Sequence, residues 1–341
     1  MDYEPEPKAD TARQSVYRDW RISQKAMRKY DKEPGAIVGD TNDPKAFTTA
    51  QTTSVKEKHR EKAARTGEVA KGRVNADVTG NGLNDAISRW AFRYDGVDAA
   101  VAKLRKGVWL SKLDLTSYFL KIPWSEAWSK KWGWFKDFRR DGGVWNGRGR
   151  PPKGWPDVEE MHKPPWRRYS NGSFGTSIMP AWASTLSGVL AGILRHCGID
   201  CVFYVDDFLI ISDTEEEGKR QLAKALKVIV DLGLATNDKV EGPSQQLEYL
   251  GLLIDTVKGE VTITKVRCAR LRRAIAEVLK EGRATRSALH TLQGKLGWCG
   301  MAVRGGRAYM AGLRDVVRES KGSKPHRRLQ VDESLREDLE W

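Results

Sequence analysis

The stretch CVFYVDDFLIIS, residues 201–212, places two adjacent aspartates, Asp206 and Asp207, inside an apolar run. Ionised carboxylates are rarely buried unless they are paired or bind a cation. Both flanks, CVFYV and FLIIS, have the β-branched and aromatic residues typical of strands, so the aspartates fall where a tight hairpin would turn. The stretch therefore predicts a β-hairpin whose aspartates either only cap the turn or belong to a site.

A second apolar segment with one carboxylate lies upstream, in LSKLDLTSYF, residues 110–119. It is predicted to be a strand with Asp114 in its middle. If this strand neighbours the hairpin, its aspartate and the Asp206-Asp207 pair can share divalent cations. Two cations held by carboxylates are a known device for in-line phosphoryl transfer, and Mg²⁺ suits a site made of a few carboxylates and substrate phosphates.

The remaining pattern predicts a mixed α/β core followed by helices. Residues 97–104 and 181–197 have apolar residues at helical spacing, and each segment is followed by a glycine. Thr214 and Glu217 form a capping box for a further helix, and QLEYLGLLIDT, residues 246–256, reads as one strand. Beyond Lys265 the pattern is all-helical, with apolar stripes at Leu271/Ile275/Val278 and Leu289/Leu292/Leu296 that predict a helical core.

Two regions lack this order. Residues 1–66 are rich in charged residues and poor in large apolar ones, which predicts an N-terminal extension that is part helical and part disordered. Residues 136–172 are dense in Gly, Pro, Trp and Arg and are predicted to be a long loop.

The charge of the chain predicts a polyanionic partner. Its 341 residues include 59 Lys and Arg against 45 Asp and Glu, a net charge of +14. Residues 258–328 hold 18 basic and 5 acidic residues, whereas residues 1–70 hold 14 and 12. The excess lies in the C-terminal part, where it would grip nucleic-acid phosphates without reading sequence.

Composition also limits where in the cell the protein is expected. The chain has no apolar run long enough to span a bilayer, and its polar N-terminus is unlike a signal peptide. We therefore expect a soluble, intracellular protein, in either the cytoplasm or the nucleus, with no membrane partner. Its four scattered cysteines fit neither a disulfide framework nor a zinc site and are expected to be reduced thiols.

The sequence resembles the reverse transcriptase family over roughly residues 71–341, and specifically retroelement enzymes with a YVDD or YLDD box, such as LTR and tyrosine-recombinase retrotransposons. The resemblance implies an α+β fold, a right-hand polymerase with a ferredoxin-like palm, fingers and an all-helical thumb. The implied boundaries are an extension at 1–66, fingers at 67–110, a palm at 111–257 with an inserted loop at 136–172, a basic thumb at 258–330 and the start of a connection segment at 331–341.

Catalytic residues follow from the same resemblance. LDLTSYF matches the motif of the first catalytic aspartate, which gives Asp114 that role, and the YVDD box gives it to Asp206 and Asp207. These three, with Leu115, are the implied metal ligands for Mg²⁺, or alternatively Mn²⁺. Lys239, in LGLATNDKVEG, is the implied acid that protonates pyrophosphate, with an ordinary solvated loop lysine as the alternative.

The resemblance also implies nucleotide contacts. Phe119 lies at the family's aromatic gate, where a bulky ring collides with a ribose 2′-hydroxyl. Phe174 and Gly175, in SFGTSIMPAW, match a motif beneath the incoming nucleotide, although Gly172-Ser173 replaces the usual Leu-Pro. Arg73, assisted by Lys71, is the implied triphosphate clamp, with an ordinary salt bridge to Asp77 as the alternative. Tyr118 departs from the family by replacing a small residue before the gate.

The implied activity is RNA-directed DNA polymerase, a nucleotidyltransferase that extends a primer on an RNA or DNA template with dNTPs. The alternatives are a catalytically defective or domesticated nucleic-acid-binding relic and, against the argument from Phe119, an RNA-dependent RNA polymerase. Ribonuclease H and integrase or recombinase activities would lie on other domains or proteins. The implied primer and template contacts are Tyr204, Tyr249, Leu250, Gly251, Lys295, Arg304 and Arg307.

Overall fold

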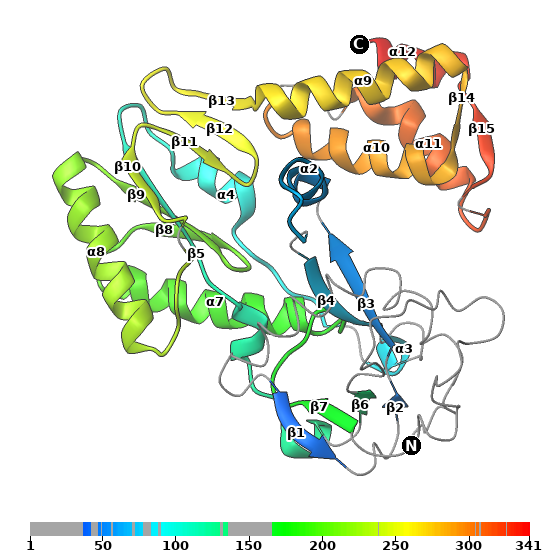
Figure 1. The fold of residues 1–341 in the computed structure, drawn as a ribbon. Coiled ribbons are helices and arrows are strands. Elements are labelled where there is room, and N and C mark those ends of the chain that lie inside the picture. The colour runs from blue at the N-terminus through cyan, green and yellow to red at the C-terminus, as the bar shows by residue number, and fades with distance from the viewer. Residues whose placement is uncertain are drawn as a thin grey trace. The chain divides into compact units, whose positions relative to one another are not determined.

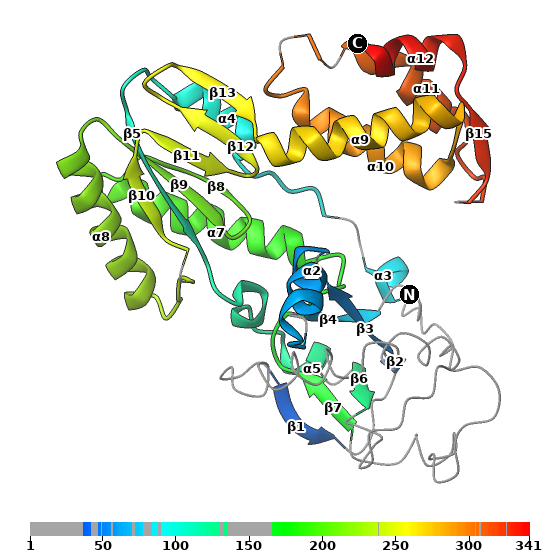
Figure 2. The same cartoon turned by 45° about the horizontal axis from the view of Figure 1, so that its top comes forward.

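A computed structural model describes most of the chain (Figures 1 and 2). The described residues are 37–41, 47–48, 50–55, 57–69, 72–77, 83–87, 90–129, 132–135, 166–237, 239–303, 305–306, 308–324 and 326–341. Its contacts divide the chain into two units. The first comprises Met1–Arg93 with Leu115–Val189, and the second Tyr94–Asp114 with Leu190–Trp341.

A four-stranded antiparallel sheet forms the centre of the second unit, with strand order β10-β5-β9-β8. Its strands are β5 (Trp109–Asp114), β8 (Cys201–Tyr204), β9 (Asp207–Ser212) and β10 (Glu241–Ser244). Helix α7 (Met179–His196) precedes β8, and α8 (Glu215–Asp231) follows β9 and packs on the sheet (Figure 1). This β-α-β-β-α-β order confirms the ferredoxin-like palm.

Alternation along the strands directs apolar side chains to both faces of this sheet. Leu110, Leu209 and Ile211 share one buried cluster with Ala100 of α4 (Gly96–Lys103). The predicted capping box starts α8, because the Thr214 hydroxyl accepts from the Glu217 N–H at 3.2 Å. The Glu217 carboxylate in turn accepts from the Asp213 N–H, also at 3.2 Å.

The segment predicted as one strand at 246–256 is a hairpin, so that prediction was wrong. Strands β11 (Gln246–Tyr249) and β12 (Leu252–Asp255) pair around a turn at Leu250-Gly251, and β13 (Glu260–Ile263) pairs with β12. Both turn residues have positive φ, 49° and 83°, as a type I′ turn requires. Leucine rarely takes this conformation, so Gly251 is the one local turn signal in this segment.

The C-terminal region is helical, as predicted, with one addition. Its helices are α9 (Lys265–Glu281), α10 (Arg286–Cys299), α11 (Ala311–Glu319) and α12 (Glu333–Glu340), with a short 3₁₀ helix, η3 (Ala308–Met310). The predicted apolar stripes form their core, since Leu271, Val278, Leu289 and Leu292 are buried in one cluster. The prediction that this region is entirely helical missed a two-stranded ribbon of β14 (Arg283–Thr285) and β15 (Arg328–Gln330).

The first unit contains two further sheets, with strand orders β1-β7-β6-β2 and β3-β4. Their strands are β1 (Ile37–Thr41), β2 (Phe47–Thr48), β3 (Ala50–Val55), β4 (Gly72–Asp77), β6 (Trp132–Phe135) and β7 (Trp166–Tyr169). Short helices α2 (Glu57–Thr66), α3 (Leu83–Ala86), η2 (Tyr118–Lys121) and α5 (Glu126–Ser129) complete it. Three strands therefore lie within the extension predicted to be helical or disordered, whereas most of the predicted loop at 136–172 lies outside the described residues.

Candidate active site

The β8–β9 hairpin carries the aspartate doublet as predicted. Tyr204 and Asp207 are register partners, so Val205 and Asp206 form a two-residue turn. Val205 has φ of 55°, an uncommon conformation for a β-branched residue. Positive φ at the first central residue alone is the pattern of a type II′ turn, which matches the twist of a hairpin. The turn thus holds Asp206 at the end of the sheet.

Asp114 and Asp207 are direct cross-strand neighbours, because Asp114 ends β5 and pairs with Asp207 at the start of β9. The prediction that Asp114 lies in mid-strand was therefore wrong by position, since the strand stops at the carboxylate. Asp207 lies on the face of Leu209 and Ile211, and Asp114 on the face of Leu110, so both carboxylates share one side of the sheet.

The donor set fits a magnesium ion, although the chain does not form a closed cage. No group of three His, Cys, Asp or Glu side chains with metal-binding spacing occurs in the described ranges. Mg²⁺ is commonly held by one or two carboxylates together with substrate phosphates, so the pair of Asp114 and Asp207 beside Asp206 satisfies that requirement. Leu115, the fourth implied ligand, has a buried side chain and offers only main-chain atoms.

Two tyrosines lie against the Asp207 end of the hairpin. Tyr249 is 1% exposed, and its hydroxyl donates to the Asp207 carbonyl at 3.4 Å. Burial, with the nearby Asp207 charge, raises the pKa of Tyr249 well above its usual range. Burial, a hydrogen bond with Tyr94 and the Asp207 charge raise the pKa of Tyr204 to about 12. Both phenols, which are neutral at pH 7 even without these shifts, therefore also stay protonated in alkaline solution.

The implied primer contact of Tyr249 is limited by its burial. Its side chain packs in the sheet core beneath the β8–β9 hairpin, which leaves only its main chain for a contact with a primer. The adjacent turn, Leu250-Gly251, remains a candidate for primer contact. Gly251 suits this turn because of its positive φ, whereas a Cβ there would meet only the end of the flexible Arg267 side chain, at 2.2 Å.

Two of the residues implied in nucleotide binding, both in the first unit, form an aromatic pair. Phe119 and Phe174 have ring centroids 5.1 Å apart. Gly175 has φ of 111°, and its carbonyl accepts from the Asn84 side-chain amide at 3.0 Å. The Asn84 carbonyl oxygen accepts from the Ser177 N–H at 2.8 Å. Asn84 therefore clamps the turn that follows Phe174, a role that the sequence motif did not indicate.

The two departures from the family pattern have physical explanations in this unit. A Cβ on Gly172 would lie 2.6 Å from the Phe119 carbonyl oxygen, so a larger residue does not fit beside Phe119. Tyr118 is buried, and its hydroxyl bonds to the Ala183 carbonyl at 3.3 Å and to the Ser187 hydroxyl at 3.1 Å. Tyr118 therefore anchors the segment that carries Phe119 to α7.

We expect Gly172→Ala to destabilise the protein by about 1–3 kcal/mol, because the new methyl group forces backbone movement against Phe119. Chemical denaturation of the two proteins measures this difference. Gly192→Ala is the matched control, since that glycine lies in α7 with open space around its Cβ position, and the change should stabilise by roughly 0.5–1 kcal/mol. Equal stability of Gly172→Ala and the parent protein would contradict the close approach.

The structure describes only some of the remaining predicted site residues. Lys239 is exposed, and its main-chain N–H donates to the Asn237 side chain at 2.8 Å. Arg73 lies in β4, opposite Ser54 of β3, and its side chain is outside the description. Lys71, Arg304 and Arg307 also lie outside the described residues. The structure therefore leaves the triphosphate clamp a prediction.

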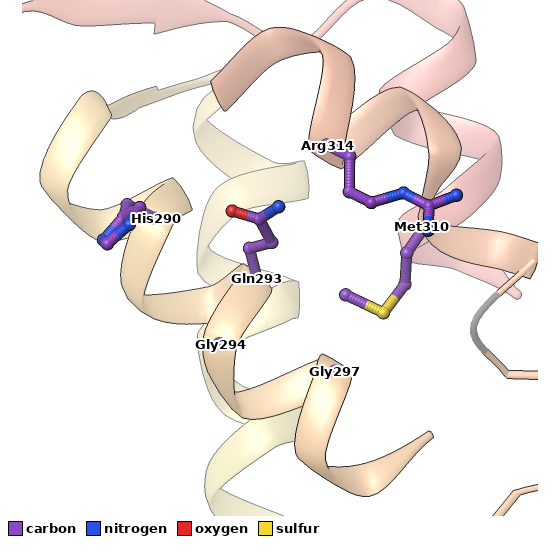
Figure 3. Close-up of a pocket in the computed structure, with 6 residues that line it drawn as sticks. All are labelled: His290, Gln293, Gly294, Gly297, Met310 and Arg314. Atoms are coloured by element: carbon purple, nitrogen blue, oxygen red, sulfur yellow. The ribbon is translucent and has the colours of Figure 1, made fainter. Parts of the chain in front are cut away.

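A concave surface lies along one face of α10 (Figure 3). Four residues follow helical spacing on that face: His290, Gln293, Gly294 and Gly297. Met310 and Arg314 complete the wall of this hollow, which has a volume of about 340 Å³. Figure 3 shows the Gln293, Met310 and Arg314 side chains around the space beside the two glycines. Lys295 is exposed on the same helix. The surface thus combines close access to a helix backbone with a mostly apolar lining, to which Gln293 and Arg314 add polar groups.

Sheet order, hairpin and helical region together define a right-hand polymerase fold. The chain belongs to the reverse transcriptase family, because the family model described as reverse transcriptase (RNA-dependent DNA polymerase) matches residues 71–254. No curated protein matches it in sequence. Among the helices described, none has the length and apolar character needed to cross a membrane.

Two solved structures illustrate the likeness of fold. A foamy viral protease-reverse transcriptase dRH in complex with double-stranded DNA has a TM-score of 0.61 and 14% identity, covering 93% of this chain and 46% of that one. A foamy viral protease-reverse transcriptase in complex with an RNA/DNA hybrid has a TM-score of 0.62 and 14% identity, covering 99% of this chain and 38% of that one. The chain thus spans less than half the length of either.

Proposed function

We propose that the protein is an RNA-directed DNA polymerase that extends a primer 3′-hydroxyl with dNTPs on an RNA or DNA template. The observation that carries this proposal is the pairing of Asp114 with Asp207, next to Asp206, at one end of the palm sheet in a member of the reverse transcriptase family. A nucleotidyl transfer needs little more from the protein than carboxylates for divalent ions and groups that position the reactants.

In this proposal Asp114, Asp206 and Asp207 hold Mg²⁺, or Mn²⁺, with Leu115 contributing through its main chain. Bound there, the metal would activate the primer hydroxyl and neutralise charge on the leaving pyrophosphate. Lys239 supplies a proton to that pyrophosphate, and Arg73 with Lys71 binds the triphosphate. The Phe119 ring, packed on Phe174, excludes a ribose 2′-hydroxyl.

We further propose the implied subdomains: fingers at 67–110, a palm at 111–257, a thumb at 258–330 and the start of a connection segment at 331–341. The YVDD box at 204–207 supports an origin in an LTR or tyrosine-recombinase type of retroelement. Ribonuclease H and integration activities would come from other domains or proteins.

Primer extension on poly(rA)/oligo(dT) with Mg²⁺ tests the activity. We expect incorporation of dTTP and almost none of UTP. Equal use of UTP would favour an RNA polymerase, whereas tight duplex binding without extension would favour a relic that has lost catalysis. An Mg²⁺ chelator should stop the reaction, and addition of excess Mg²⁺ should restore it.

The concave surface on α10 is the proposed binding place for the template–primer duplex, because its two glycines permit close approach and the surrounding region is strongly basic. Gly294→Leu should weaken binding of an RNA/DNA hybrid by about tenfold, or 1.4 kcal/mol. Fluorescence anisotropy at one fixed salt concentration measures this.

Ala276→Leu adds a comparable side chain at an exposed position on α9 and should bind like the parent protein. An equal loss of affinity in both variants would mean that added bulk, rather than contact at α10, weakens binding. Unchanged affinity of Gly294→Leu would remove the α10 surface from the duplex site.

A further inference from the structure

Asn237 connects the catalytic strand β5 to the loop that carries Lys239. Its main-chain N–H donates to the Asp114 carbonyl at 3.0 Å. Its side-chain amide nitrogen donates to Oδ2 of the Asp114 carboxylate. Its side-chain oxygen accepts from the Lys239 N–H at 2.8 Å. The side-chain amide of Asn237 thus donates to Asp114 and accepts from Lys239, two residues implied in catalysis.

The chemistry of an amide suits this place. A single donated hydrogen bond restricts rotation of the Asp114 carboxylate, yet it adds no positive charge that would compete with a cation for the same oxygens. A lysine or arginine there would neutralise the carboxylate instead. The bond from Asn237 to Asp114 therefore orders the carboxylate while leaving its charge available.

The acceptor end of Asn237 acts on the loop. A side-chain oxygen that accepts from the main-chain N–H two residues later closes an Asx turn, which fixes the local path of the chain. Since the main-chain N–H of Asn237 also donates to the Asp114 carbonyl, the residue that starts this turn is held at the end of β5. The main chain at Lys239 is therefore positioned relative to Asp114 through Asn237.

We propose that Asn237 is a positioning residue that orients the Asp114 carboxylate and sets the loop of Lys239 relative to it. This inference rests on the proposed polymerase function. Groups that orient a metal-binding carboxylate typically change metal affinity or activity roughly 10- to 100-fold when removed. The same size of effect is expected here, on turnover and on metal binding, without loss of the fold.

Two variants separate the halves of the interaction. Asn237→Ala removes both side-chain bonds, whereas Asn237→Asp keeps an acceptor for the Lys239 N–H and replaces the donor to Asp114 with a negative charge. Gln246→Ala is the matched control, because it removes an amide-to-carboxylate bond, to Asp255 at 3.2 Å, from an exposed position on β11.

Steady-state primer extension should give a kcat that is lower by roughly 10- to 100-fold in both Asn237 variants, with KM for dTTP little changed. Titration of Mn²⁺ into each protein with template–primer, followed by the electron paramagnetic resonance signal of free Mn²⁺, should give weaker binding to Asn237→Ala by a similar factor. Gln246→Ala should match the parent protein in both measurements.

Each contrary result has a distinct meaning. Parent-like turnover of Asn237→Asp would overturn the role of the donor to Asp114, and parent-like Mn²⁺ binding by Asn237→Ala would overturn the orientation of the carboxylate. Unfolding of both variants in thermal denaturation would make Asn237 a structural residue and also overturn the proposal. Failure of the parent protein itself to extend a primer would instead reject the proposed function, and Mn²⁺ binding would still report on Asn237.

Discussion

Asp206→Asn is expected to lower primer extension by about 10³-fold or more. Asparagine has nearly the shape of aspartate, so the two-residue turn between β8 and β9 should persist. What the substitution removes is one negative charge at the sheet end where Asp114 and Asp207 already lie side by side. Because a divalent cation there depends on carboxylate charge, the loss should fall on catalysis and leave duplex affinity near that of the parent protein.

The measurement is single-turnover extension of oligo(dT) on poly(rA) at saturating dTTP, together with anisotropy of the bound duplex. Asp213→Asn is the control, because its carboxylate is exposed and paired with Arg105 at 2.5 Å on the surface. That surface pair is worth little, so the control should retain parent activity. Substantial extension by Asp206→Asn would exclude Asp206 as a required carboxylate and would undermine the two-metal proposal.

Phe119→Ala should admit ribonucleotides. The ring is partly buried against Phe174, and its removal leaves room for a 2′-hydroxyl. The ratio of kcat/KM for dTTP over UTP should fall by roughly 10- to 200-fold, the range that steric differences of a few atoms in a pocket provide. The change should come from faster use of UTP, because no contact to the metal-binding carboxylates is implied for this ring.

Competition between dTTP and UTP on one primer–template measures the ratio directly. Phe92→Ala is a suitable control, since that phenylalanine is 37% exposed and has no proposed role in the site. A ratio that stays at the parent value in Phe119→Ala would assign discrimination to another residue. A parent enzyme that already uses UTP well would show that the ring does not act as a gate.

Several features of this protein are determined by its sequence alone. The hairpin at 201–212 was predictable because continuous apolar flanks around two aspartates leave few other arrangements for the charges. The start of α8 was predictable because a capping box is a local motif, complete within four residues. The helical C-terminal core followed from apolar stripes, since helical periodicity depends only on neighbouring turns.

Other features required the tertiary structure. The neighbourhood of Asp114 and Asp207 depends on the pairing of strands far apart in the chain, which no local pattern specifies. Tyr249 reads as a strand residue available to a primer, and only its packing beneath Asp207 shows that it is a core side chain. The turn at Leu250-Gly251 was missed because leucine rarely takes a positive φ, and only the pairing of β11 with β12 shows that the chain turns there.

Two asparagines illustrate why some features follow from the sequence and others only from the tertiary structure. Asn84 and Asn237 lie in segments whose composition is ordinary, yet each joins residues far apart in the chain, Asn84 to Gly175 and Asn237 to Asp114. Local motifs predict only the structure of residues that are close in sequence, because helix propensity and capping act over a few residues. Hydrogen bonds between distant segments form only as the chain folds. The sequence therefore determined the three carboxylates and the hairpin that carries two of them, whereas the tertiary structure alone decided which group bonds to Asp114.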